Sequence, residues 1–137
     1  MNESVLIFVG QMKSQAKSFE DLDCWKHETT LRRRLTELVK IFTLEEKYRL
    51  TDQIIRASRS VTSNIAEGYG RFHFQENTQY CRQAGGSLYE LIDHLLIATD
   101  HGYISKEELT GLKKDITSCL GLLNGYINYL QKAKAMM

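Results

Sequence analysis

Residues 60–71 decide the fold, and they read Ser60-Val61-Thr62-Ser63-Asn64-Ile65-Ala66-Glu67-Gly68-Tyr69-Gly70-Arg71. Val61 and Ile65 have the four-residue spacing of one face of a helix, and the stretch ends at two glycines. Asn64 and Glu67 stand beside these apolar positions, and a buried amide or carboxylate needs hydrogen-bond partners. The stretch is therefore either a structural polar lock or a functional site.

In the structural interpretation, the lock consists of Asn64, Glu67, Gly68, Arg82 and Ser87. Glu67 accepts a hydrogen bond from Arg82 or Ser87 on the next helix, and Asn64 holds the turn. Gly68 ends the helix in the left-handed conformation, where other residues meet a Cβ penalty. In the functional interpretation, Asn64 and Glu67 instead contact a ligand or a partner.

Apolar residues on both sides of this stretch recur at the spacing of amphipathic helices. They predict helices at about 24–43, from 43 or 45 to 68, at 75–101, and from 105 to about 131. Ser/Thr-x-x-Glu capping boxes at Thr43 and Ser105 mark the second and fourth helix starts. Four such helices with short connections predict an all-α, antiparallel up-down four-helix bundle.

The third predicted helix contains Gly85 and Gly86, and each costs roughly 1 kcal/mol relative to alanine in a helix interior. Close approach of another helix is the gain we expect to offset this cost. The bundle domain is expected over residues 19–131, with an N-terminal extension at 1–18 and a frayed tail at 132–137. The extension contains the apolar run at 5–9, which we expect to dock on the domain or on a neighbouring subunit.

The 137-residue chain has no proline and a net charge of only +1, which excludes a strong global attraction to nucleic acid or membrane. Its three cysteines, Cys24, Cys81 and Cys119, form no CxxC pair. This predicts reduced thiols in a cytoplasmic protein rather than a zinc or disulfide framework. No stretch is long enough for a membrane span.

Seven arginines surround the opening stretch, and residues 26–82 carry eleven basic against seven acidic residues. They are either a contact surface for nucleic acid or a partner, or a solvated face interleaved with acidic partners. These partners are Glu28, Glu37, Glu45, Glu46 and Asp52. The arginines are Arg32, Arg33, Arg34, Arg49, Arg56, Arg59 and Arg71.

No catalytic or cofactor motif appears, so we expect neither an enzyme nor a cofactor. A di-iron bundle needs Glu-x-x-His on two helices, whereas here Glu90 is followed by Asp93 and His94 and no second pair exists. Gly68 and Gly70 follow a helix rather than a strand, so they form no phosphate-binding loop.

The chain resembles a four-helix bundle family over about residues 19–131. The resemblance lies in Asp21-Leu22-x-x-Trp25, the stretch 60–71, Ala84-x-Gly86-Ser87-Leu88-x-Glu90-Leu91 and Gly102-Tyr103-Ile104. Some members of that family are encoded in intervening sequences of bacterial 23S ribosomal RNA genes. A related branch contains the accessory variability determinant of diversity-generating retroelements.

This resemblance implies a homopentameric ring, and in the retroelement branch the ring is basic, binds nucleic acid and associates with a reverse transcriptase. The family usually has proline where Thr62 stands, and the present chain is nearly neutral. We therefore expect a non-enzymatic oligomer that binds RNA, DNA or a nucleic-acid enzyme. The alternative is a structural or scaffolding oligomer with a protein partner and no nucleic-acid role.

Overall fold

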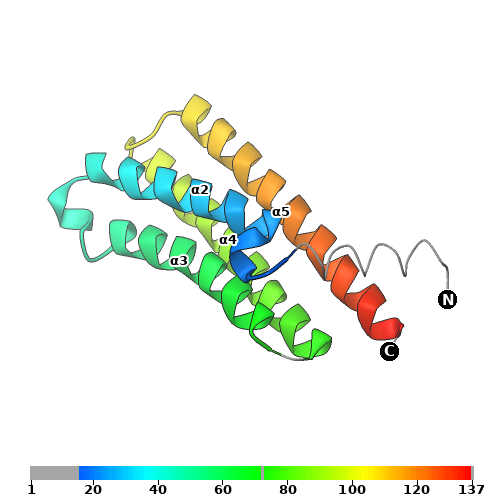
Figure 1. Cartoon of the computed structure of the whole chain (residues 1–137). Helices are drawn as coiled ribbons and strands as arrows, with labels where there is room; N and C mark the ends of the chain where they lie inside the picture. The colour runs from blue at the N-terminus through cyan, green and yellow to red at the C-terminus, as the bar shows by residue number, and fades with distance from the viewer. Residues whose placement is uncertain (1–15, 72, 137) are drawn as a thin grey trace.

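The computed structural model describes residues 16–71 and 73–136, and these form four long α-helices (Figure 1). The helices are α2 (Asp23–Leu38), α3 (Leu50–Tyr69), α4 (Phe74–Asp100) and α5 (Lys106–Ala135). Short 3₁₀ turns precede and follow α2, at Phe19–Asp21, Val39–Ile41 and Leu44–Glu46. The described residues contain no strand, so the predicted all-α bundle is confirmed.

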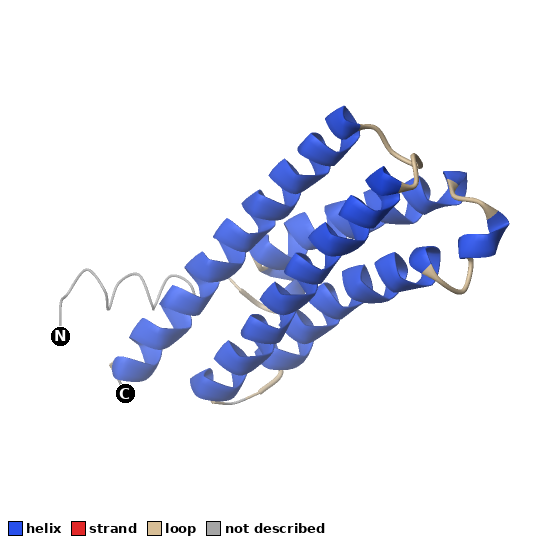
Figure 2. Cartoon of the chain, turned by 180° about the vertical axis from the view of Figure 1, so that it is seen from behind, coloured by secondary structure: helices blue, strands red, loops and turns tan. Residues whose placement is uncertain are grey.

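The four helices lie side by side with alternating direction (Figures 1 and 2). Each packs on two neighbours, in the order α2–α3–α4–α5 and back to α2; α3 and α4 share the most extensive interface, α2 and α5 the least. The α2–α3 and α4–α5 connections meet at one end of the bundle. There Phe42 stacks on Tyr103 with ring centroids 4.9 Å apart.

One hydrophobic core runs the length of the bundle. The stripes predicted from helical spacing supply it, because residues three and four apart lie on one face. Side chains with no measurable exposure come from all four helices, and the other main core residues of α5 are 1% exposed. The main members are Leu35, Ile54, Val61, Ile65, Leu88, Leu91, Leu95, Leu112, Ile116, Leu123 and Leu130.

The second helix starts later than its capping pattern predicts. The Thr43 side chain makes no cap hydrogen bond and instead lies 3.1 Å from the Tyr103 hydroxyl. Leu44–Glu46 is a 3₁₀ turn, and the α-helix begins only at Leu50. The capping box at Ser105 is confirmed, with the Glu108 amide 3.1 Å from the Ser105 hydroxyl.

Gly68 does not end α3 in a left-handed conformation, so that prediction was wrong. The helix continues to Tyr69, and the only described glycine with a positive φ is Gly102. Gly68 is needed for another reason: α4 approaches so closely that an added Cβ would lie 2.7 Å from the Asn77 side-chain oxygen and 2.9 Å from Tyr80 Cβ.

The glycine pair in α4 gives a different result. A Cβ on Gly85 would meet Leu123 at an ordinary 3.7 Å, and one on Gly86 would meet nothing within 4 Å. No close helix approach within the described chain therefore explains Gly86.

At the C-terminus, α5 remains helical to Ala135, and Lys134 donates to Gln75 at 3.0 Å. The apolar run at 5–9 lies outside the described residues.

Candidate functional site

The three consecutive arginines of α2 fan outward over its two neighbours. Arg32 reaches α3, where its guanidinium donates to the Thr62 hydroxyl at 2.8 Å. Arg34 turns the other way and forms an ion pair with Asp115 of α5. Arg33 lies between them and is exposed. Consecutive helical residues are 100° apart, so one run of arginines serves two interfaces and solvent.

Thr62 connects the Arg32 side chain to the backbone of α3. Its hydroxyl also donates to the backbone carbonyl of Arg59, three residues earlier, at 3.2 Å, and the Arg59 side chain is exposed. Thr62 stands where the resemblance expects proline, and α3 runs unbroken through it. We call Arg32, Arg33 and Arg59 the α2/α3 arginine face, and none lies within ion-pair distance of a described carboxylate.

The other predicted arginines are not part of this face. Arg56 pairs with Asp52 one turn earlier, at 3.4 Å. Arg49 precedes the first residue of α3 and is exposed. The predicted seven-arginine set therefore divides into one shared face and separate local contacts.

Arg71 lies at the α3–α4 turn, where it gathers several partners. It forms an ion pair with Glu67 at 3.3 Å and one with Glu76 at 3.8 Å. Its guanidinium also donates to the Tyr80 hydroxyl at 2.7 Å and lies over that ring. The predicted partner of Glu67, Arg82 or Ser87, is therefore corrected to Arg71, and the Glu67 side chain is half exposed rather than buried.

Asn64 does not hold the turn either, because its side chain bonds back along α3. Its amide donates to the Ser60 carbonyl at 2.9 Å and lies 3.1 Å from the Ser60 hydroxyl. Ser60 in turn lies 2.9 Å from the Ser87 hydroxyl of α4. These groups line an open 300 Å³ hollow on the α3/α4 surface together with Gly86, Gln83 and Glu90, while Arg82 is exposed on α4.

The buried polar contact at this end of the bundle belongs to Asn77, which sequence reasoning missed. Its amide donates to the Tyr126 hydroxyl at 2.9 Å, and its oxygen lies 3.5 Å from the Cys81 sulfur. Cys81 follows Asn77 by four residues, and Ala84 follows Cys81 by three. Asn77 therefore continues the apolar stripe of α4. That register is the signal that would have revealed it.

Glu28 is the second buried polar residue that the sequence interpretation misplaced. It was expected among the surface partners of the arginines, yet its side chain is 1% exposed. It stands four residues after Cys24 and three before Leu31, on the buried stripe of α2. Neither of its carboxyl oxygens has a well-formed hydrogen bond.

Burial dominates the electrostatics of Glu28. Desolvation raises its pKa from 4.5 to about 7, against smaller lowering effects of the nearby Cys119 thiol and the Arg32 charge. The thiols of Cys24 and Cys81 are also buried, which raises their pKa values to about 12. These cysteines are accordingly neutral thiols in the physiological range.

The described part of the chain contains no cluster of three or more His, Cys, Asp or Glu side chains arranged to hold a metal ion. Among the described helices, none has the combination of length and apolar character that crossing a membrane requires.

Comparison with known proteins supplies the family. The model of the 23S rRNA-intervening sequence protein family matches residues 20–125, from the turn before α2 to a point two thirds of the way along α5. A search of curated proteins gave no match. The matched range includes α2, α3, α4, the first two thirds of α5, the stretch 60–71 and the α2/α3 arginine face. The chain therefore belongs to the 23S rRNA-intervening sequence protein family.

Proposed function

We propose that the protein is a non-enzymatic, oligomeric interaction module that binds nucleic acid through the α2/α3 arginine face. One observation carries the proposal: no described carboxylate lies within ion-pair distance of Arg32, Arg33 or Arg59, and the last two are exposed on the neighbouring helices α2 and α3. Guanidinium groups in this state are suited to phosphate oxygens, which they contact through paired N–H donors.

Oligomerisation would strengthen nucleic-acid binding, because one subunit contributes only three arginines to the α2/α3 arginine face. The proposed assembly is the homopentamer that the resemblance implies, and it repeats the same three arginines in every subunit. Several weak sites on one particle bind one long polyanion with far greater avidity than a single site. The proposed setting is the cytoplasm, with RNA, DNA or a reverse transcriptase bound to nucleic acid as the partner.

Salt-dependent binding to single-stranded RNA and duplex DNA tests the proposal. Each lost phosphate contact reduces the slope of log K against log salt by about 0.7 to 0.9. Replacing Arg33 and Arg59 by alanine is expected to weaken binding and lower that slope.

The matched control replaces Arg34 and Arg56, which already pair with Asp115 and Asp52. The control pair is expected to change binding much less. A flat isotherm for both nucleic acids at low salt would reject the proposal, as would equal losses in the two double variants.

A second candidate function is a scaffolding oligomer that binds a protein partner. It is favoured by the α2–α3 connection, where Ile41, Leu44 and Tyr48 are 63%, 90% and 83% exposed. Three large apolar side chains on one short connection form the kind of surface that protein contacts cover. If this function is correct, binding to RNA and DNA is absent, and replacing Leu44 and Tyr48 by serine abolishes partner binding while leaving the bundle folded.

A further inference from the structure

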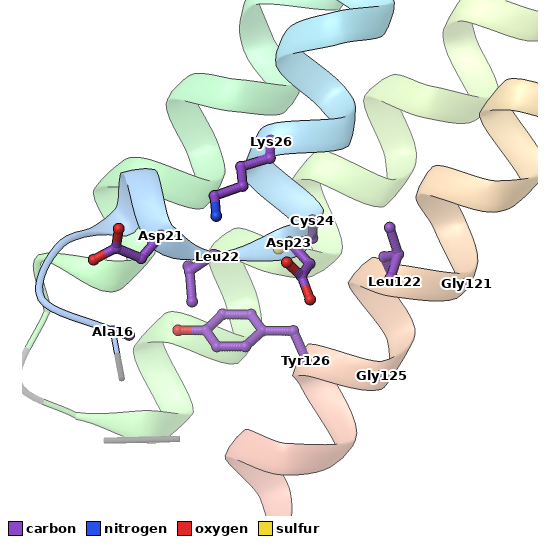
Figure 3. Close-up of a pocket in the computed structure, with 10 residues that line it drawn as sticks. All are labelled: Ala16, Asp21, Leu22, Asp23, Cys24, Lys26, Gly121, Leu122, Gly125 and Tyr126. Carbon is purple, nitrogen blue, oxygen red and sulfur yellow. The ribbon is translucent and has the colours of Figure 1, made fainter. Parts of the chain in front are cut away.

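The α2/α5 interface, the least extensive of the four, is open at one end. An open cleft of about 570 Å³ lies there, between the start of α2 and the second half of α5 (Figure 3). We call it the α2/α5 cleft. Its apolar lining comes from both sides: Ala16, Leu22, Cys24, Leu122 and Tyr126. Asp21, Asp23 and Lys26 add charged groups to the lining.

The α5 side of this cleft is unusually bare. Gly121 and Gly125 line it one turn apart, and a Cβ built on either would meet nothing within 4 Å. Each glycine costs roughly 1 kcal/mol in a helix interior relative to alanine. Two small residues four apart let another backbone lie close against a helix. No described segment of this chain occupies that position.

The described chain begins at the mouth of the cleft. Ala16 is both the first described residue and one of the cleft-lining residues. Its carbonyl accepts a hydrogen bond from the Tyr69 hydroxyl at 3.2 Å, so α3 fixes the point from which residues 1–15 depart. A capping box formed by Ser18 and Asp21 fixes the next turn.

The sequence before Ala16 contains the apolar partner that the cleft lacks. Val5-Leu6-Ile7-Phe8-Val9 is five consecutive apolar residues, followed by Gly10 and a polar tract. Seven residue steps separate Val9 from Ala16, and they reach about 23 Å when extended. The exposed glycine turn of α5 is only about 6 Å long. Because Ala16 lines the same cleft as both glycines, the run can reach Gly121 and Gly125 of its own chain.

We propose that residues 5–9 pack into the α2/α5 cleft of the same chain, against the bare face formed by Gly121 and Gly125. A segment tethered at the cleft has an effective concentration in the millimolar range, which favours it over the same segment of a second copy. Burial of the run then covers apolar surface on both partners. This inference does not depend on nucleic-acid binding.

Disulfide trapping in the full chain tests the proposal. The variant carries Phe8→Cys and Gly125→Cys, is exposed to a mild oxidant, and is analysed on a denaturing gel and by mass spectrometry of the bridged peptides. A bridge between positions 8 and 125 at the mass of one chain is the expected result. The same bridge at the mass of two chains assigns the cleft to a second copy and overturns the proposal, as does the absence of a bridge.

The control pairs Phe8→Cys with Gly86→Cys, on the α3/α4 surface, where an added side chain also meets open space. This pair is expected not to bridge. A bridge formed equally well there would mean that the segment has no preferred site, and would overturn the proposal.

A second measurement requires no new cysteine. Replacing Leu6 and Phe8 by aspartate is expected to raise the alkylation rate of Cys24, which lines the cleft, at least tenfold. Cys81, fully buried among the helices, serves as the internal reference and is expected to keep its rate. An unchanged Cys24 rate, or equal increases at both thiols, would overturn the proposal.

Discussion

Glu28 was expected on the surface, and the structure buries its side chain. Its carboxyl group is buried near the Cys119 thiol, and the Arg32 charge only partly offsets the desolvation that raises its pKa. The pKa in the folded state, about 7, lies above the 4.5 of the free side chain. The folded protein therefore binds this proton more tightly than the unfolded chain.

Stability should consequently depend on pH through Glu28. Its protonated form favours the fold fully below pH 4.5, and this contribution is lost as the pH rises towards and through 7. The shift corresponds to an upper limit of about 3 kcal/mol, at 1.36 kcal/mol per pKa unit. Glu28→Gln is expected to remove this loss and to exceed the wild type in stability at pH 8, measured by urea unfolding at pH 5 and pH 8.

The matched control is Glu37→Gln, because Glu37 is 71% exposed and pairs with Lys40. It is expected to leave the difference between pH 5 and pH 8 unchanged. If the stability of the Glu28→Gln protein depends on pH as strongly as that of the wild type, the raised pKa of this carboxyl group is contradicted.

Gly68 provides the second prediction at the scale of single residues. Gly68→Ala places a methyl group 2.7 Å from the Asn77 side-chain oxygen and 3.1 Å from its carbonyl. Overpacking of this kind costs about 1–3 kcal/mol, which exceeds the helix-propensity gain of about 1 kcal/mol. The urea midpoint should fall, and it should stay nearly unchanged for Gly70→Ala, where the nearest atom is 3.5 Å away. Equal midpoints for both variants would disprove the close approach.

At the scale of the elements, the capping patterns predict one helix start correctly and another incorrectly. The Ser105 box begins α5, where the Ser105 hydroxyl accepts from the Glu108 amide and the Glu108 side chain accepts from the Ser105 amide. The similar pattern at Thr43 does not begin α3, because its hydroxyl lies beside Tyr103 and the stacked Phe42 ring fixes the connection. The local sequence determines which residues are able to cap a helix, and packing between elements decides whether the cap forms.

Helix α4 allows a direct test of whether its outer face is free. A methyl group on Gly86 meets no atom of the described chain within 4 Å, so Gly86→Ala should stabilise the subunit by up to about 1 kcal/mol. Ser87→Ala, which removes the contact with Ser60, should instead destabilise it by about 1 kcal/mol. Urea unfolding measures both. A destabilised Gly86→Ala protein would mean that another chain covers this face.

At the scale of the whole molecule, the mass of the particle in solution tests the proposed pentamer. A subunit of 15.8 kDa should give a particle of five times that mass if the proposed pentamer forms. Light scattering coupled to size exclusion measures this directly. A monomer at micromolar concentration would remove the repeated arginine face from the proposed function, while leaving the binding test of a single subunit intact.

The sequence by itself determined the four helices, their order and the apolar stripes, because helical periodicity is a local property that the core then satisfies. It also identified the motif at 60–71, and with it the family. Only the tertiary structure decided the roles of individual polar residues. Glu67 pairs with Arg71, Asn77 supplies the buried contact, Glu28 is enclosed, and Gly68 allows α3 and α4 to touch. The Asn77–Tyr126 contact, the burial of Glu28 and the close approach at Gly68 depend on residues of different helices, whose packing no local pattern specifies.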